Sequence, residues 1–173
     1  PTHPDHSKLG LAYFSTGNFE KAATELDAAI KASEPHPITL HMRLGRAYQE
    51  LGRYNEAAAS FSTAVQLNPE LAAGYYNAWF SIGVCRQLLD RQQEAAEAYL
   101  NALRYRPDVP ETRFNLGAAY LMLNDPVNAR EQCDSLRNYD AAAADRLTEM
   151  IRRFGHVSAE TGKTGSKTVS PGK

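Results

Sequence analysis

The sequence lacks the features that mark several large classes of protein. It has only two cysteines among its 173 residues, Cys85 and Cys133, and they show neither CxxC nor Cys/His metal spacing. This excludes a disulfide framework or a zinc site as the organising principle, and we expect both to be small buried thiols. The sequence shows no signal peptide and no run of about 18 apolar residues. We therefore expect a soluble chain with no membrane insertion, in an undetermined compartment.

Neither sign of charge is in excess. The chain has 19 lysines and arginines against 20 aspartates and glutamates, with a formal net charge of -1. Nucleic-acid-binding proteins usually carry a concentrated basic patch, whereas the basic residues here are scattered along the chain. We therefore predict no nucleic-acid partner. A hydrophobic fraction of 43% is that of an ordinary globular protein rather than a fibrous or disordered one.

The motifs of catalysis and metal binding are also missing. The TGKT at residues 161–164 looks like the end of a phosphate-binding loop, but that motif needs a glycine where Val157 stands and a strand before it. His3 and His6 have no acidic or cysteine set beside them that would complete a metal site. No nucleophile elbow is present. We therefore predict a chain that is not an enzyme and that needs no cofactor or metal.

What the sequence does contain is a fourfold internal repeat. Glycines recur after an aliphatic residue at Gly10, Gly45, Gly83 and Gly117. An alanine follows each of them 12 residues later, at Ala22, Ala57, Ala95 and Ala129. A large residue stands four positions after each alanine except the last, which is followed by Cys133. The repeated glycines are 35, 38 and 34 residues apart, and self-similarity at such a period indicates a repeat architecture.

This pattern resembles the tetratricopeptide repeat, in which an aliphatic-Gly pair, a Tyr, an Ala, an aromatic residue, an Ala and a Pro follow in that order. The resemblance covers about residues 5–136 and implies an all-α, right-handed solenoid of antiparallel helix pairs. Glycines such as Gly45 would then lie where two helices approach closely, with burial of neighbouring side chains offsetting their low helix propensity. Within an array over 1–155, the predicted repeats are 3–37, 38–71, 72–109 and 110–139.

A capping helix is predicted over residues 140–154. Its apolar residues recur at helical spacing: Leu147, Met150, Ile151 and Phe154. Asp140 is the expected N-cap and Gly155 the expected stop. Repeat arrays need such a one-sided helix at an open end. The segment 156–173 is rich in Gly, Ser, Thr and Lys, and we predict that it is a disordered tail.

The third repeat differs from the others by four extra residues before Gly83. Four residues turn a helix by about 400°, so the insertion adds about 6 Å of length and nearly keeps the helix faces. We predict a long helix over 70–89 that projects one turn beyond its neighbours. Its aromatic residues Tyr75, Tyr76 and Trp79 predict an exposed surface through which copies of the chain could form a homo-oligomer.

The resemblance also implies a binding face, because family members bind peptides in a concave groove formed by the first helices of the pairs. Aligned on the repeated glycine, the peptide-binding groove residues are Met42, Arg43, Arg46, Gln49, Phe80, Val84, Gln87, Phe114, Asn115 and Leu121. Co-chaperone members hold a peptide carboxylate with Lys and Asn at two of these positions. Met42 and Arg46 stand at these positions in the second repeat, and Phe80 and Val84 in the third repeat, so the carboxylate clamp is absent.

We therefore predict a non-catalytic protein-interaction module or scaffold that binds a peptide or amphipathic segment in its groove. Arg43 and Arg46 would meet acidic groups, and Phe80 and Phe114 would fill apolar pockets of the interface. Two alternatives stay open: a homo-oligomerising scaffold, and the regulatory part of a longer enzyme. Some of the groove residues could instead pack against a neighbouring helix of the array.

Overall fold

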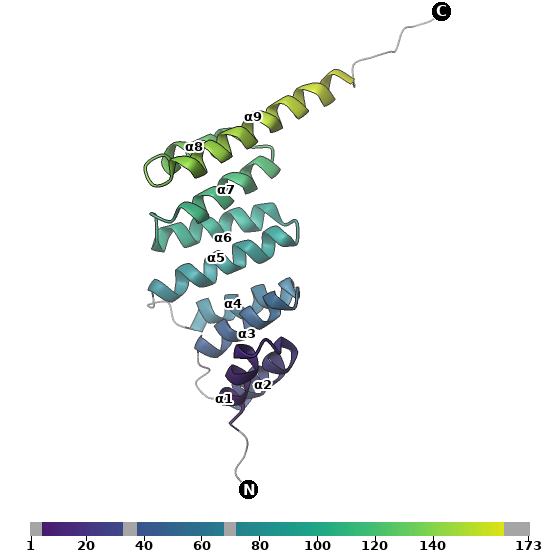
Figure 1. Cartoon of the computed structure of the whole chain (residues 1–173), viewed down its shortest axis with the longest axis vertical. Helices are drawn as coiled ribbons and strands as arrows, with labels where there is room; N and C mark the ends of the chain where they lie inside the picture. Colours follow the sequence, from purple (N-terminus) through teal and green to yellow (C-terminus); the bar gives the residue numbers. More distant parts are fainter. Residues whose placement is uncertain (1–4, 33–37, 68–71, 165–173) are drawn as a thin grey trace, which may run out of the picture. The chain divides into compact units, whose positions relative to one another are not determined.

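The computed structural model describes residues 5–32, 38–67 and 72–164, which contain helices and no strand. The helices are α1 (His6–Ser15), α2 (Phe19–Ala32), α3 (Ile38–Glu50), α4 (Tyr54–Leu67), α5 (Ala72–Leu88), α6 (Gln92–Tyr105), α7 (Pro110–Met122), α8 (Pro126–Leu136) and α9 (Ala141–Thr164). Short turns join the two helices of each pair, which run antiparallel (Figure 1). This arrangement confirms the predicted fold class, an all-α helical solenoid.

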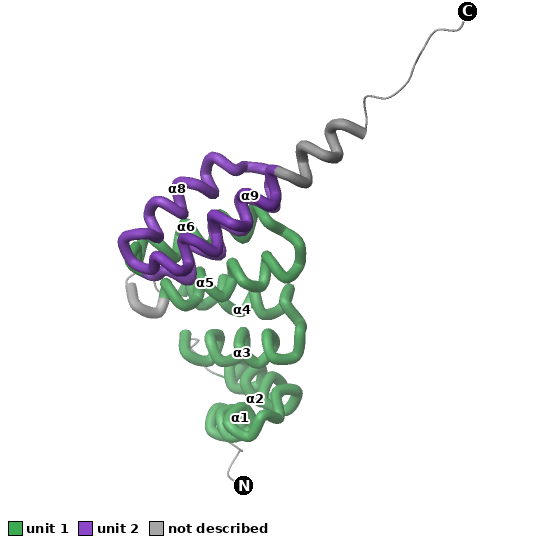
Figure 2. Tube along the Cα trace, turned by 45° about the horizontal axis from the view of Figure 1, so that its top comes forward, with its two compact units in different colours: residues 1–108 green, residues 109–173 purple. Residues whose placement is uncertain are grey.

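The helices divide into two units (Figure 2). Residues 1–108 contain α1 to α6, and residues 109–173 contain α7 to α9. In the first unit each helix contacts the next one along the chain, from α1 and α2 to α5 and α6. In the second unit α9 contacts both α7 and α8. The first unit is therefore a stack of three helix pairs, and the second is one pair covered by a third helix.

Glycines in the first helix of each pair mark the closest approach of two helices. A Cβ atom built on Gly45 would lie 2.8 Å from Cε1 of Phe61, and one on Gly83 would lie 2.5 Å from Cε1 of Tyr99. Both rings are completely buried. A glycine costs a helix about 1 kcal/mol relative to alanine, whereas burying a large side chain contributes about 1.5–3 kcal/mol. Glycine at these positions therefore stabilises the folded chain on balance.

The turn between the two helices of a pair needs one residue in the left-handed region. Gly52 has φ 71° in the second pair, and Asp90 and Asn124 have φ 58° and 59° in the third and fourth. The next residue then closes the turn, as when the N–H of Arg53 donates to the carbonyl oxygen of Tyr48 at 2.8 Å. Glycine, aspartate and asparagine are the residues that tolerate this conformation, so the turn is kept where the sequence changes.

In the second unit, α9 supplies a large side chain that the fourth repeat lacks. The repeat has Cys133 where the others have a leucine or an aromatic residue. A Cβ atom built on Gly117 would clash with Cδ2 of Leu147, which is completely buried. Leu147 from α9 therefore occupies the space that the small cysteine leaves. Both thiols are buried, as predicted, with Cys85 and Cys133 0% and 3% exposed.

Helix α9 begins as predicted but extends further. Asp140 accepts a hydrogen bond from the backbone N–H of Ala143 at 2.9 Å, which is the expected N-cap interaction. Met150 is 39% exposed, so it lies outside the buried stripe that was predicted to include it. The helix does not stop at Gly155 but continues to Thr164. Residues 156–164 of the predicted disordered tail are therefore helical, and residues 165–173 lie outside the described residues.

Helix α5 is longer than its counterpart in the preceding pair, with 17 residues against 13 in α3. This confirms the effect of the insertion, although residues 70 and 71 of the predicted helix lie outside the described residues. The predicted exposure is wrong for Tyr75 and Tyr76, which are only 4% and 7% exposed, while Trp79, the third residue of the predicted surface, is half-buried. Tyr75 donates its hydroxyl to the carbonyl oxygen of Val65 at 3.0 Å and stacks on Tyr105. The ends of α4 and α6 therefore cover the extra turn.

Candidate protein-binding groove

A cleft of about 510 Å³ lies between α3 and α5 in the first unit. It is lined by Met42, Arg43, Arg46, Gln49, Glu50, Asn77, Phe80, Ser81 and Val84. On each helix the lining residues recur at spacings of three and four, which places them on one face. The cleft contains six of the ten predicted groove residues: Met42, Arg43, Arg46, Gln49, Phe80 and Val84.

Three residues of this cleft are not among the ten predicted groove residues: Glu50, Asn77 and Ser81. Each stands three or four positions from another lining residue, Glu50 after Arg46, Asn77 before Phe80 and Ser81 after Asn77. Residues three and four apart lie on the same face of a helix, so the 3.6-residue periodicity could have identified all three. Glu50 adds one acidic group beside the two arginines of the same helix.

The arginines of α3 form the charged wall of the cleft. The guanidinium carbons of Arg43 and Arg46 lie 5.7 Å and 5.8 Å from the centroid of the Phe14 ring. Both side chains are exposed, and neither forms an ion pair with a carboxylate in the described part of the chain. The ring of α1 therefore orients two cations whose hydrogen-bond donors remain available to a ligand.

The opposite wall of the cleft, from α5, is more apolar. Phe80 is half-buried, and its ring centroid lies 5.9 Å from those of Tyr76 and Tyr99. Val84 is half-buried one turn further along the same helix. Contacts with these two buried tyrosines fix the Phe80 ring, while its remaining surface faces the cleft.

Gln87 does not line this cleft. Its side-chain oxygen accepts a hydrogen bond from the buried hydroxyl of Tyr99 at 2.7 Å. Tyr99 occupies the position where the first two repeats have Leu26 and Phe61. The hydroxyl group of Tyr99 needs a partner when buried, and Gln87 supplies it. The structure therefore gives Gln87 a stabilising contact within the helix pair.

The three remaining predicted groove residues belong to the second unit. Phe114 lines a separate cleft of about 490 Å³ between α7 and α9, where the Arg146 guanidinium lies 5.4 Å from its ring centroid. Asn115 is half-buried. Leu121 is only 3% exposed and lies in the hydrophobic core with Leu147. Its side chain therefore packs against the capping helix.

A cluster of charges on α9 borders the cleft of the second unit. Arg152 and Arg153 donate hydrogen bonds to the Glu149 carboxylate at 2.8 Å and 2.7 Å. These hydrogen bonds lower the pKa of Glu149 from its ordinary value of 4.5 to about 2. The glutamate neutralises part of the basic charge here. This cleft therefore offers a ligand less uncompensated positive charge than the cleft between α3 and α5.

Two features are absent from the described residues. Those residues hold no group of three or more His, Cys, Asp or Glu side chains that could bind a metal ion. None of the helices, as far as they are described, is long and apolar enough to cross a membrane.

Comparison with known families assigns the repeat. A family model described as "Tetratricopeptide repeat" matches residues 7–72 and 42–98, and one described as "TPR repeat" matches residues 89–124. The chain belongs to the tetratricopeptide repeat family. The tetratricopeptide repeat (TPR) assignment confirms the resemblance seen in the sequence and supports a protein-interaction module. A comparison with curated protein sequences found no match.

Solved TPR structures share the fold at low sequence identity. A crystal structure of the MamA protein is 18% identical, with a TM-score of 0.70, and the match covers 96% of each chain. A TPR protein from Parabacteroides merdae is 17% identical, with a TM-score of 0.76 over 92% of this chain and 63% of that one. The first TPR of Spaghetti (RPAP3), bound to an HSP90 peptide, is 24% identical, with a TM-score of 0.60 over 69% and 90%.

Proposed function

We propose that this TPR protein binds a partner segment that carries acidic side chains on one face and apolar side chains on the other, in the cleft between α3 and α5. The observation that carries the proposal is the pair Arg43 and Arg46, exposed and without a carboxylate partner among the described residues. They stand across a cleft from the half-buried ring of Phe80.

The charges of the cleft favour an acidic ligand. The cleft is lined by two guanidinium groups and by one carboxylate, that of Glu50, so its net charge is positive. A guanidinium binds a carboxylate through two parallel hydrogen bonds, and these charge-assisted bonds are about twice as strong as neutral ones. Because Phe14 already orients Arg43 and Arg46, less side-chain entropy is lost on binding.

The division of the cleft into two walls determines the form of the ligand. The cations come from α3, whereas Phe80 and Val84 come from α5. A segment lying between the helices therefore presents acidic groups to one side and apolar groups to the other. An amphipathic helix with apolar residues at spacings of three and four has this property.

A selection from a random peptide library tests this proposal without a known partner. The wild-type protein is expected to enrich peptides with aspartate or glutamate next to leucine or phenylalanine. The Arg43→Glu/Arg46→Glu double variant should lose these peptides about tenfold and enrich peptides with lysine or arginine instead. The matched control, Arg130→Glu/Arg137→Glu, reverses the charge of one exposed arginine of α8 and of the exposed arginine that follows this helix, and it should select the wild-type set.

The proposal is wrong if the wild type and the Arg43→Glu/Arg46→Glu variant select the same peptides. In that case the cleft between α3 and α5 is not the binding site. The Phe80→Ala variant examines the apolar wall separately. It is expected to keep the acidic preference and to lose the preference for leucine and phenylalanine, because truncating a central aromatic anchor costs about 2 kcal/mol of binding.

A further inference from the structure

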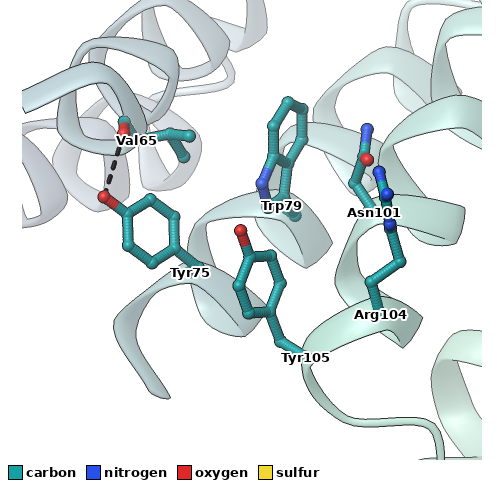
Figure 3. Close-up of a pocket in the computed structure, with 6 residues that line it drawn as sticks. All are labelled: Val65, Tyr75, Trp79, Asn101, Arg104 and Tyr105. Atoms are coloured by element: carbon teal, nitrogen blue, oxygen red, sulfur yellow. Dashed lines mark hydrogen bonds between the residues drawn. The ribbon is translucent and has the colours of Figure 1, made fainter. Parts of the chain in front are cut away.

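A second cavity, of about 470 Å³, lies on the other side of α5 (Figure 3). It is lined by Val65, Tyr75, Trp79, Asn101, Arg104 and Tyr105, and we call it the aromatic pocket. At 100° per residue, Tyr75 and Trp79 project about 180° away from the α5 residues that line the groove. The aromatic pocket is therefore separate from the cleft between α3 and α5, and a ligand could occupy either one alone.

The aromatic walls of this pocket are held in place by the fold. The ring centroids of Tyr75 and Tyr105 are 5.4 Å apart, with an angle of 21° between the stacked rings. The Tyr75 hydroxyl donates to the carbonyl oxygen of Val65 at 3.0 Å, which ties the pocket to the end of α4. Trp79 is half-buried beside them. Such preformed, mostly aromatic cavities of a few hundred Å³ are the usual form of binding sites.

The aromatic pocket offers more hydrogen-bond donors than acceptors. The Trp79 indole and the Arg104 guanidinium are donors only, and the Tyr105 hydroxyl is a third donor. None of these three side chains has a hydrogen-bond or ion-pair partner among residues 5–32, 38–67 and 72–164. In Figure 3 the Tyr105 hydroxyl points toward the Trp79 indole, and Asn101 and Arg104 lie on the other side of that ring.

We propose that the aromatic pocket binds a proline-containing acidic segment of a partner protein. Proline has no N–H, so such a segment presents carbonyl acceptors with few donors, the complement of this pocket. Proline rings also fit between aromatic side chains, which is the basis of polyproline II recognition in aromatic-lined grooves. Arg104 is exposed and faces no carboxylate in the pocket lining, so it favours an acidic residue beside the proline.

The protein contains a reporter for this binding, because Trp79 is its only tryptophan. The experiment titrates the intact chain with an acetylated and amidated peptide, PPEPPEPP, and records tryptophan fluorescence. A saturable change is expected. Two matched peptides, AAEAAEAA and PPKPPKPP, remove the proline rings and reverse the charge respectively. Each should bind at least about tenfold more weakly, since each lacks one of the two recognised features.

Variants that keep Trp79 locate the site. Arg104→Gln should weaken binding of PPEPPEPP about tenfold, and Tyr105→Phe, which removes only a hydroxyl, should weaken it severalfold. Arg130→Gln, an exposed arginine of α8 that lines neither the aromatic pocket nor the groove, is the matched control and should bind like the wild type. Far-UV circular dichroism and the urea midpoint of each variant establish that the fold is retained.

Three outcomes would overturn the proposal. They are the absence of a saturable fluorescence change, equal binding of either matched peptide, and wild-type binding by Arg104→Gln. The proposal does not depend on the groove, because the library selection uses variants of Arg43 and Arg46 and this titration uses variants of Arg104 and Tyr105. Failure of one experiment therefore leaves the result of the other unaffected.

Discussion

Replacing Gly83 by alanine is expected to destabilise the first unit, although alanine is the better helix former. The new Cβ atom would lie 2.5 Å from Cε1 and 2.6 Å from Cδ1 of Tyr99. Non-bonded carbon atoms ordinarily stay about 3.5 Å apart or more. The Tyr99 ring cannot move away from the new Cβ atom, because it is completely buried and its hydroxyl is hydrogen-bonded to Gln87.

The expected loss follows from two opposing terms. Overpacking a tight core costs about 1–3 kcal/mol, and a clash this close to a fixed ring belongs at the upper end of that range. The gain in helix propensity from Gly83→Ala is about 1 kcal/mol. The free energy of unfolding should therefore fall by about 2 kcal/mol.

Urea unfolding, followed by Trp79 fluorescence and by far-UV circular dichroism, measures this loss. Repeating Gly83→Ala in a Tyr99→Leu background removes the ring atoms that clash, so there the substitution should cost less than about 1 kcal/mol. Gly155→Ala is a second control, because a Cβ atom at Gly155 meets nothing within 4 Å. Equal losses in both backgrounds, or a Gly83→Ala protein as stable as the wild type, would refute the packing explanation.

Two further predictions concern α9. Leu147→Ala should lower the free energy of unfolding by about 3 kcal/mol, because Leu147 is completely buried. The same change at Met150, which is 39% exposed, should cost under about 1 kcal/mol, and equal losses in urea denaturation would contradict this packing. By NMR titration the Glu149 carboxyl should have a pKa of about 2, rising toward 4.5 in Arg152→Gln/Arg153→Gln. Because the folded pKa is lowered, the stabilisation is complete above pH 4.5 and is lost as the pH falls toward 2; an unchanged pKa in the double variant would contradict the pairing.

The fold could be predicted from sequence because each repeat pairs a small residue with a large one at a fixed distance. Gly45 and Phe61, like Gly83 and Tyr99, are 16 residues apart and meet across one helix pair. Such contacts are local, so the spacing alone encodes them. The burial of Tyr75 was not predictable in the same way, because it depends on Val65 and Tyr105 at the ends of two other helices.

The candidate groove was predictable to the extent that helix periodicity fixes it. Met42 and Arg46 lie four residues apart on α3, and the register of the repeat places both in the cleft. The register cannot show when another element covers a position. Leu121 has the register of Gln49, four residues after the repeated glycine, but α9 buries it, and α9 docks there because Cys133 leaves space for Leu147. The capping helix lies outside the repeat, so the repeat pattern carries no information about its contacts.

The four-residue insertion in the third repeat connects these observations. It lengthens α5 without rotating its faces, so Phe80 and Val84 still face the groove. The added turn carries Tyr75 to the end of α4, where its hydroxyl reaches the Val65 carbonyl oxygen, and its ring then forms a wall beside Trp79. A helix of the length found in α3 would be too short to form this second surface. The departure from the repeat thus gives one helix two opposite lined cavities, one bordered by arginines and one by aromatic rings.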